Sequence, residues 1–105
     1  MVFVETHAFT ARVREHLSDD QYRLLQATLV QNPALGDLIP ASGGLRKLRW
    51  GGSGRGKRGG LRVIYFWHKA SNRILFLFAY LKNESSDLTP SQRAALRKVI
   101  ETEYP

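Results

Sequence analysis

The sequence predicts an α+β fold: a small antiparallel sheet with two N-terminal helices and a C-terminal helix, in the order β-α-α-β-β-β-α. Three patterns predict it. Apolar residues recur every four positions near the N-terminus, two later segments are rich in β-branched and aromatic residues, and a capping box with proline begins the last amphipathic segment. At 105 residues, of which 43% are hydrophobic, we expect a single domain spanning residues 1–105.

The N-terminal half predicts a short strand followed by a helical hairpin. Val2 to Glu5 has strand-forming composition. The next segment, Thr6 to Leu17, places its apolar residues on one helical face, namely Phe9, Val13 and Leu17. Ser18 and Gln21 form a capping box that begins a second helix, whose face carries Tyr22, Leu25 and Leu29. Asn32-Pro33 ends that helix, because proline disfavours helix in the residue before it.

The C-terminal half predicts three strands and a helix. Asp37 to Gly44 is expected to be a loop that leads into a strand at Leu45 to Trp50, and the glycine-rich segment Gly51 to Gly60 cannot form regular structure. Leu61 to His68 and Arg73 to Leu81 form a hairpin around Ser71-Asn72, with core aromatic residues. Thr89-Pro90 begins the last helix, whose apolar side is Leu96, Val99 and Ile100.

Charge and composition narrow the class of function. The net charge is +7, and no acidic residue lies between Asp37 and Glu84, which is the pattern of a nucleic-acid-binding surface. With no cysteine, the chain has neither disulfides nor thiolate metal sites. It has no apolar run long enough to span a membrane and no secretory signal at its start, so we expect a cytoplasmic protein.

Strand periodicity gathers a set of candidate catalytic residues. Alternation places Lys47 and Arg49 on one face of their strand. If the three strands are neighbours, that face also presents Arg62, Tyr80 and Lys82. Such a cluster suits RNA cleavage by the RNA's own 2′-hydroxyl, which needs a proton acceptor, cations for the phosphate and a proton donor. Lys47 or Lys82 could transfer protons, but positioning of phosphate alone explains the residue types equally well.

Other residues are weaker candidates. Arg55, Lys57 and Arg58 lie in the glycine-rich segment, where the backbone can approach RNA closely, and we expect them to contact phosphates. His68 and Glu84 are secondary candidates for acid–base roles. No pair among His7, His16 and His68 has the spacing of zinc ligands, so we expect neither a metal nor another cofactor.

Several motifs together resemble the RelE/HigB toxin superfamily, most closely its HigB-like branch. They are Gly43-Gly44-Leu45-Arg46-Lys47-Leu48-Arg49-Trp50, Gly54-Arg55-Gly56-Lys57-Arg58-Gly59-Gly60, Arg62-Val63-Ile64-Tyr65, Tyr80-Leu81-Lys82-Asn83 and Asp87-Leu88-Thr89. The resemblance covers nearly the whole chain. It implies a fold like that of the microbial ribonucleases and a toxin of a type II toxin–antitoxin system, which inhibits translation by cutting messenger RNA on the ribosome.

The resemblance also implies site residues and partners. Lys47 and Arg49 resemble the family's strand lysines, Arg62 its arginine at the start of the next strand, and Lys82 its later basic residues. Asn83 stands where the family has a second arginine, and Arg46 and Asn83 are further expected RNA contacts. Leu88-Thr89 occupies the place of a base-stacking tyrosine found in some members, so either Tyr80 substitutes or that role is absent.

The implied partners are the ribosomal A site with its messenger RNA, an antitoxin of helix-turn-helix type, and operator DNA reached through that antitoxin. We expect the antitoxin to cover an exposed apolar face of the first or the last helix. The charge pattern equally supports an alternative, a non-catalytic RNA-binding or DNA-binding module. A third hypothesis is a corepressor that acts with its antitoxin, a role that can coexist with the first.

Overall fold

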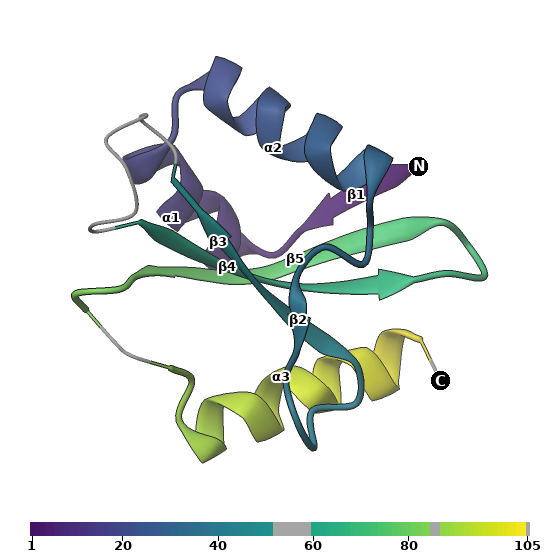
Figure 1. Ribbon diagram of the computed structural model, residues 1–105. Helices are drawn as coiled ribbons and strands as arrows, with labels where there is room; N and C mark the ends of the chain where they lie inside the picture. The colour runs from purple at the N-terminus through teal and green to yellow at the C-terminus, as the bar shows by residue number, and fades with distance from the viewer. Residues whose placement is uncertain (52–59, 85–86, 105) are drawn as a thin grey trace.

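A five-stranded sheet in the order β1-β5-β4-β3-β2 forms the centre of the protein (Figure 1). The computed structural model describes residues 1–51, 60–84 and 87–104. The α+β class and every predicted helix and strand are confirmed. The elements are β1 (Val2–Glu5), α1 (His7–His16), α2 (Asp19–Gln31), β2 (Asp37–Leu38), β3 (Leu45–Trp50), β4 (Leu61–His68), β5 (Arg73–Leu81) and α3 (Pro90–Glu103).

The sheet differs from the predicted one in two respects. It is mixed, because β1 pairs in parallel with β5, and Asp37–Leu38 forms the edge strand β2 where a loop was expected. The period of residues within a strand says nothing of the direction of a distant partner, and two residues are too few to show a period. The loop after β2 is held by the buried Ser42 hydroxyl, which donates to the carbonyl of Ile39 and accepts from the backbone N–H of Leu45.

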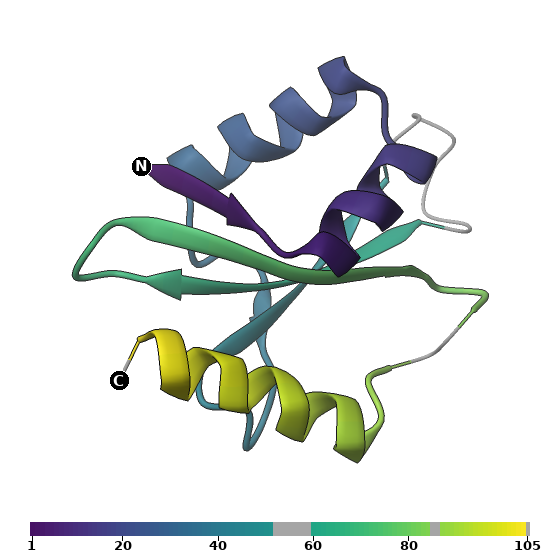
Figure 2. The ribbon, with the colours of Figure 1, turned by 180° about the vertical axis from the view of Figure 1, so that it is seen from behind.

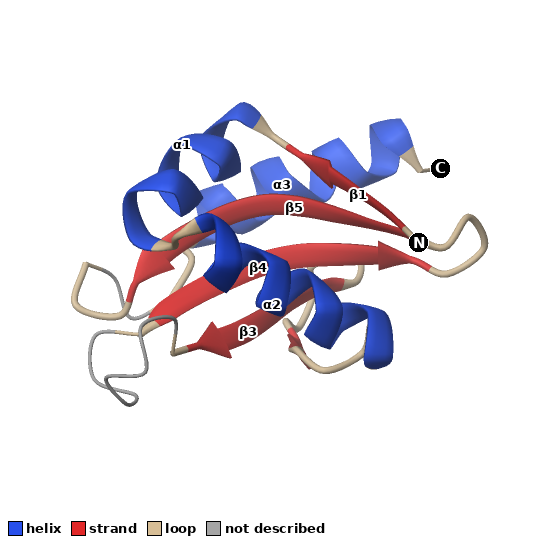
Figure 3. Ribbon diagram, turned by 90° about the horizontal axis from the view of Figure 1, so that it is seen from above, coloured by secondary structure: helices blue, strands red, loops and turns tan. Residues whose placement is uncertain are grey.

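Helices cover both faces of the sheet. Helices α1 and α2 lie over one face and α3 over the other (Figures 1 and 2), and the view from above shows α1 and α2 crossing the central strands (Figure 3). The first core contains Phe9, Val13, Leu25, Leu29, Leu48, Val63, Tyr65 and Phe76, and the second contains Leu45, Ile64, Leu75, Leu77, Tyr80, Leu88 and Ile100. The aromatic residues of β4 and β5 that were predicted to be core are buried or half-buried. Tyr80, which was expected to be the exception, is buried in the second core as well.

The capping signals act as the sequence predicted. Complete capping boxes begin α2 at Ser18 and α3 at Thr89. Asn72 in the β4–β5 turn has a φ of +54°, a backbone conformation that asparagine tolerates better than most residues.

One residue of the predicted apolar side of α3 does not pack on the sheet. Val99 is 37% exposed. Among the helices of the described residues, none is long and apolar enough to cross a membrane.

An extra residue in β5 changes which side chains face α3. Tyr65 pairs with Phe76 whereas Ile64 pairs with Phe78, so Leu77 has no partner residue on β4 and forms a bulge. Thr6 holds this bulge: its backbone N–H donates to the carbonyl of Phe76 at 3.0 Å and its hydroxyl to that of Leu77 at 2.8 Å. The same hydroxyl accepts from the backbone N–H of Phe9 and caps α1.

We predict that Thr6→Val destabilises the fold. The change removes the cap of α1 and the hydrogen bond to the bulge, and these together are worth about 1–3 kcal/mol. Urea unfolding would measure the loss. Thr28→Val is the matched control, because the Thr28 hydroxyl only donates to the Leu24 carbonyl within α2. Equal midpoints for the two variants would contradict the role assigned to Thr6.

Candidate active site

Four of the predicted catalytic residues line one pocket on the face of the sheet that carries α3. The pocket has a volume of 390 Å³ and is lined by Lys47 and Arg49 of β3, Arg62 of β4, Lys82 and Asp37. We call this the basic pocket. The strand register explains it, because Arg49 lies opposite Arg62 and Arg62 lies opposite Tyr80. The prediction that these residues share a face is confirmed.

Arg62 is the buried centre of the basic pocket. It is 7% exposed, and its guanidinium donates to the carbonyl of Gly60 at 3.4 Å. Arg49 is its direct cross-strand neighbour, and like charges in that relation destabilise a sheet. A buried cation beside a second cation lowers stability unless an anion compensates. The arrangement therefore suits the binding of a phosphate group.

Two carboxylates that sequence reasoning did not select lie next to these cations. Asp37 pairs with Lys47 across β2 and β3, and Asp87 lies 3.4 Å from the Lys47 ammonium. The backbone N–H of Leu88 and then the charge of Lys47 hold the pKa of Asp87 below the ordinary value of 3.8. Asp87 is therefore ionised at neutral pH and partly offsets the repulsion among the cations. In the sequence, Asp87 stood only as part of the motif Asp87-Leu88-Thr89, just before the capping box of α3.

Tyr80 of β5 lies directly opposite Arg62 of β4, but its side chain lines a neighbouring pocket. That pocket has a volume of 230 Å³, and its other lining residues are Arg12, Phe78, Glu84, Asp87 and Gln92. Tyr80 is 3% exposed, and its hydroxyl has no hydrogen-bond partner in the described part of the chain. Burial and the charge of Asp87 raise its pKa above 10.0, against the opposing effect of Arg62. The phenol therefore keeps its proton at neutral pH.

The remaining predicted residues lie away from the basic pocket or at its edge. Arg46 points to the opposite face, where it donates to the carbonyls of Ala34 and Gly36. His68 ends β4 at the far end of the strand from Arg62. It is hydrogen-bonded to Ser71, and its ring packs at a tilt against that of Tyr104, with 4.6 Å between the ring centroids. The structure thus does not bring Arg46 or His68 to the cluster.

Asn83 and Glu84 follow β5, next to Lys82, and Glu84 forms an ion pair with Arg12 of α1. Arg55, Lys57 and Arg58 lie outside the described residues, so their predicted contacts stay predictions. Among the described residues, no group of three His, Asp or Glu side chains could hold a metal ion.

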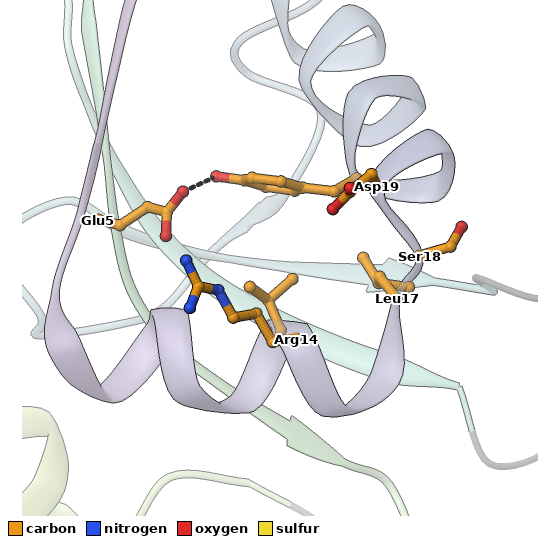
Figure 4. A pocket seen from close by; sticks show the side chains of 7 residues that line it. Glu5, Arg14, Leu17, Ser18 and Asp19 are labelled. Atoms are coloured by element: carbon orange, nitrogen blue, oxygen red, sulfur yellow. Dashed lines mark hydrogen bonds between the residues drawn. The ribbon is translucent and has the colours of Figure 1, made fainter.

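A further pocket lies between α1 and α2 and is shown in Figure 4. It has a volume of 220 Å³, and its lining includes Glu5, Arg14 and Tyr22. The Glu5 carboxylate accepts hydrogen bonds from the hydroxyls of Tyr22 and Thr10. Burial, and then the bond to Glu5, raises the pKa of Tyr22. These bonds join β1, α1 and α2, and they explain the pocket as part of the helix packing.

Comparison with known proteins defines the class. The family model described as the RelE toxin of the RelE/RelB toxin–antitoxin system matches residues 2–103. Among solved structures, an arginine double mutant of the E. coli toxin RelE in the free state has a similar fold. The TM-score is 0.61 at 13% sequence identity, and the match covers 90% of this chain and 94% of that chain.

The fold and the family match together define a toxin of a toxin–antitoxin system, in a family whose members are mRNA endoribonucleases. The chain belongs to the RelE toxin family. The superfamily predicted from the sequence is therefore confirmed, whereas the match does not distinguish its HigB-like branch, which stays a prediction.

We predict that Tyr80→Phe leaves stability unchanged or raises it by about 1 kcal/mol, because a buried hydroxyl without a partner costs free energy. If the hydroxyl donates a proton or a hydrogen bond to the substrate, the same variant cleaves RNA more slowly. Thermal unfolding and a cleavage assay on one preparation would measure both. A clear loss of stability would contradict the structural assignment of this hydroxyl.

We also predict that Asp87 makes stability depend on pH. A carboxyl whose pKa is lower in the folded than in the unfolded state stabilises the fold above the ordinary value of 3.8, and this contribution is lost as pH falls through the folded pKa. Asp87→Asn should therefore reduce the decrease in urea midpoint between pH 7 and pH 3. Asp20→Asn is the control, because the Asp20 carboxylate is 93% exposed. Parallel pH curves for wild type and Asp87→Asn would contradict the prediction.

Proposed function

We propose that this chain cuts messenger RNA in the ribosomal A site without a metal ion, through attack of the RNA's own 2′-hydroxyl on the adjacent phosphorus. One observation carries the proposal: Arg62 is buried opposite Arg49 in a pocket that also holds Lys47 and Lys82. Positioning of phosphate needs cations on a surface, but it does not need any of those cations to be desolvated. A desolvated arginine stabilises developing negative charge more strongly than an exposed one.

The proposed reaction divides its work among these side chains. The 2′-oxygen forms a bond to phosphorus and loses its proton to a base, while the bond from phosphorus to the 5′-oxygen breaks and that oxygen takes a proton. The products are a 2′,3′-cyclic phosphate and a 5′-hydroxyl end. Arg62 and Arg49 face the extra negative charge of the transition state, because a guanidinium stays protonated and binds two phosphate oxygens at once.

Proton transfer falls to the lysines and Tyr80. Lys47 lies beside Asp87, and Lys82 lies at the end of β5 on the same pocket. Tyr80 retains its proton at neutral pH, which makes its hydroxyl a candidate donor to the leaving 5′-oxygen and not the base. The base is then one of the two lysines in its neutral form.

The family implies an antitoxin partner and action on translated messenger RNA. We extend this to an antitoxin of helix-turn-helix type that also carries the complex to operator DNA. The proposed docking face on the toxin is the exposed side of α3 around Val99, which forms an apolar hollow with Ala95, Lys98, Thr102 and Glu103.

The main alternative is a module that binds RNA or DNA without cutting it. The same four cations would serve such a module, since phosphate contacts dominate nucleic-acid affinity. The burial of Arg62 next to Arg49 favours catalysis, because a desolvated guanidinium stabilises the extra negative charge of the transition state more strongly than an exposed one.

The test is cleavage of messenger RNA on programmed ribosomes, with mapping of the new 5′ ends, by wild type, Arg62→Ala and Arg73→Ala. Arg73 is the matched control because it is exposed at the opposite end of β5. We expect Arg62→Ala to lower the cleavage rate by about 10²–10³-fold, the usual effect of removing one such stabilising group. Arg73→Ala should cleave as wild type, and EDTA should leave the wild-type rate unchanged.

Other outcomes would decide against parts of the proposal. Wild-type binding to RNA without new ends would support the binding module. Cleavage that EDTA abolishes would contradict metal independence. Cleavage of free RNA as fast as RNA on the ribosome would contradict the proposed place of action.

A further inference from the structure

A reciprocally bonded turn carries Lys82 beyond the end of the sheet. The backbone N–H of Glu84 donates to the carbonyl of Leu81 at 3.0 Å, and the Glu84 carboxylate accepts from the backbone N–H of Leu81 at 2.8 Å. The side chain and the main chain of Glu84 thus close the same four-residue turn from both sides. Lys82 and Asn83 are its two central residues, so the direction of the Lys82 side chain depends on this closure.

Arg12 of α1 contacts the same carboxylate oxygen. Its terminal guanidinium nitrogen forms a short ion pair with Glu84 Oε1, the atom that also accepts from Leu81. Arg12 and Glu84 are 72 residues apart in the sequence. The backbone N–H of Leu81 and then Arg12 hold the pKa of Glu84 below the ordinary value of 4.5, so the carboxylate is ionised at neutral pH. Arg12 also contacts the Glu15 carboxylate, at 3.8 Å, and this second contact lies within α1.

The turn places Lys82 differently from the other three cations of the basic pocket. Lys47, Arg49 and Arg62 project from β3 and β4, and each of them lies opposite a residue of the neighbouring strand. Lys82 lies one residue past β5, where its backbone N–H donates to the carbonyl of Gly60 at 3.3 Å. A side chain on a turn is placed less precisely than one on a paired strand, and a displacement of about 1 Å can cost 10²-fold in rate.

We propose that Arg12 and Glu84 are positioning residues for the cleavage reaction: Arg12 fastens Glu84, and Glu84 fixes the turn that directs Lys82 into the basic pocket. This inference rests on the proposed function. It assigns Glu84 a task different from the acid–base role considered from the sequence, and it adds Arg12, which no sequence pattern indicated.

The experiment compares Arg12→Ala in two backgrounds, wild type and Glu84→Ala, by single-turnover cleavage of messenger RNA on programmed ribosomes. In the wild-type background we expect kcat to fall by about 10–100-fold while KM changes less than about twofold, since the remaining cations still bind the substrate. In the Glu84→Ala background the same substitution should change kcat by less than about twofold, because Arg12 acts only through Glu84.

Two further variants separate positioning from charge and from folding. Arg14→Ala removes the same charge from the same helix and should leave kcat near the wild-type value. Glu84→Gln keeps an oxygen that can accept from Leu81 but loses the charge that pairs with Arg12, and its kcat should fall as in Arg12→Ala. Thermal unfolding of each variant shows that the compared proteins are folded.

The outcomes are distinguishable. Equal losses in Arg12→Ala and Arg14→Ala, an equal effect of Arg12→Ala in both backgrounds, or a rise in KM alone would overturn the inference while leaving the proposed function intact. Absence of cleavage by wild type would overturn the proposed function and this inference together.

Discussion

The extra residue in β5 is the constraint on which the candidate site depends. Without the bulge at Leu77, the alternation that buries Ile74 and Phe76 under α1 and α2 would place Tyr80 and Lys82 on that same face. The one additional residue places Tyr80 and Lys82 on the face of the sheet that carries Arg62. The bulge in turn depends on Thr6, which bonds the carbonyls of Phe76 and Leu77 at the start of α1. The geometry of the pocket is therefore linked to the N-terminal helix as well as to the strands.

The α3 face of the sheet has an apolar part and a cationic part. Leu45, Ile64 and Leu75 pack with Ile100 of α3, whereas the row Arg49, Arg62 and Tyr80 carries adjacent charges. The cationic part is unfavourable for folding, because Arg62 is desolvated next to Arg49, whereas Asp87 lies beside Lys47. Bound phosphate would supply negative charge there. The proposed substrate therefore gives this unfavourable part of the sheet a physical reason.

Local sequence patterns predicted what depends on local periodicity and missed what depends on distant partners. The period of two found the shared face of Lys47, Arg49 and Arg62, and the capping signals found both helix starts at Ser18 and Thr89. The shared face of Tyr80 and Lys82 was inferred from residues beyond the bulge, where the alternation is regular again. The parallel pairing of β1 and the contacts of Asp87 and Arg12 join segments far apart in sequence, and no local period predicts them. The strand β2 was missed because two residues are too few to show a period.

Strand pairing fixes three of the four cations of the basic pocket, whereas a turn carries Lys82. This difference explains the ion pair between Arg12 of α1 and Glu84. Register fixes the three cations on β3 and β4, but Lys82 lies past the last paired residue of β5. An ion pair between partly exposed side chains adds little to the free energy of unfolding, with typical values of about 0–1 kcal/mol. The contact between Arg12 and Glu84 is therefore poorly explained as a stabilising interaction. It is well explained as a geometric one, because it acts on a turn that lies past the last residue pair of β4 and β5.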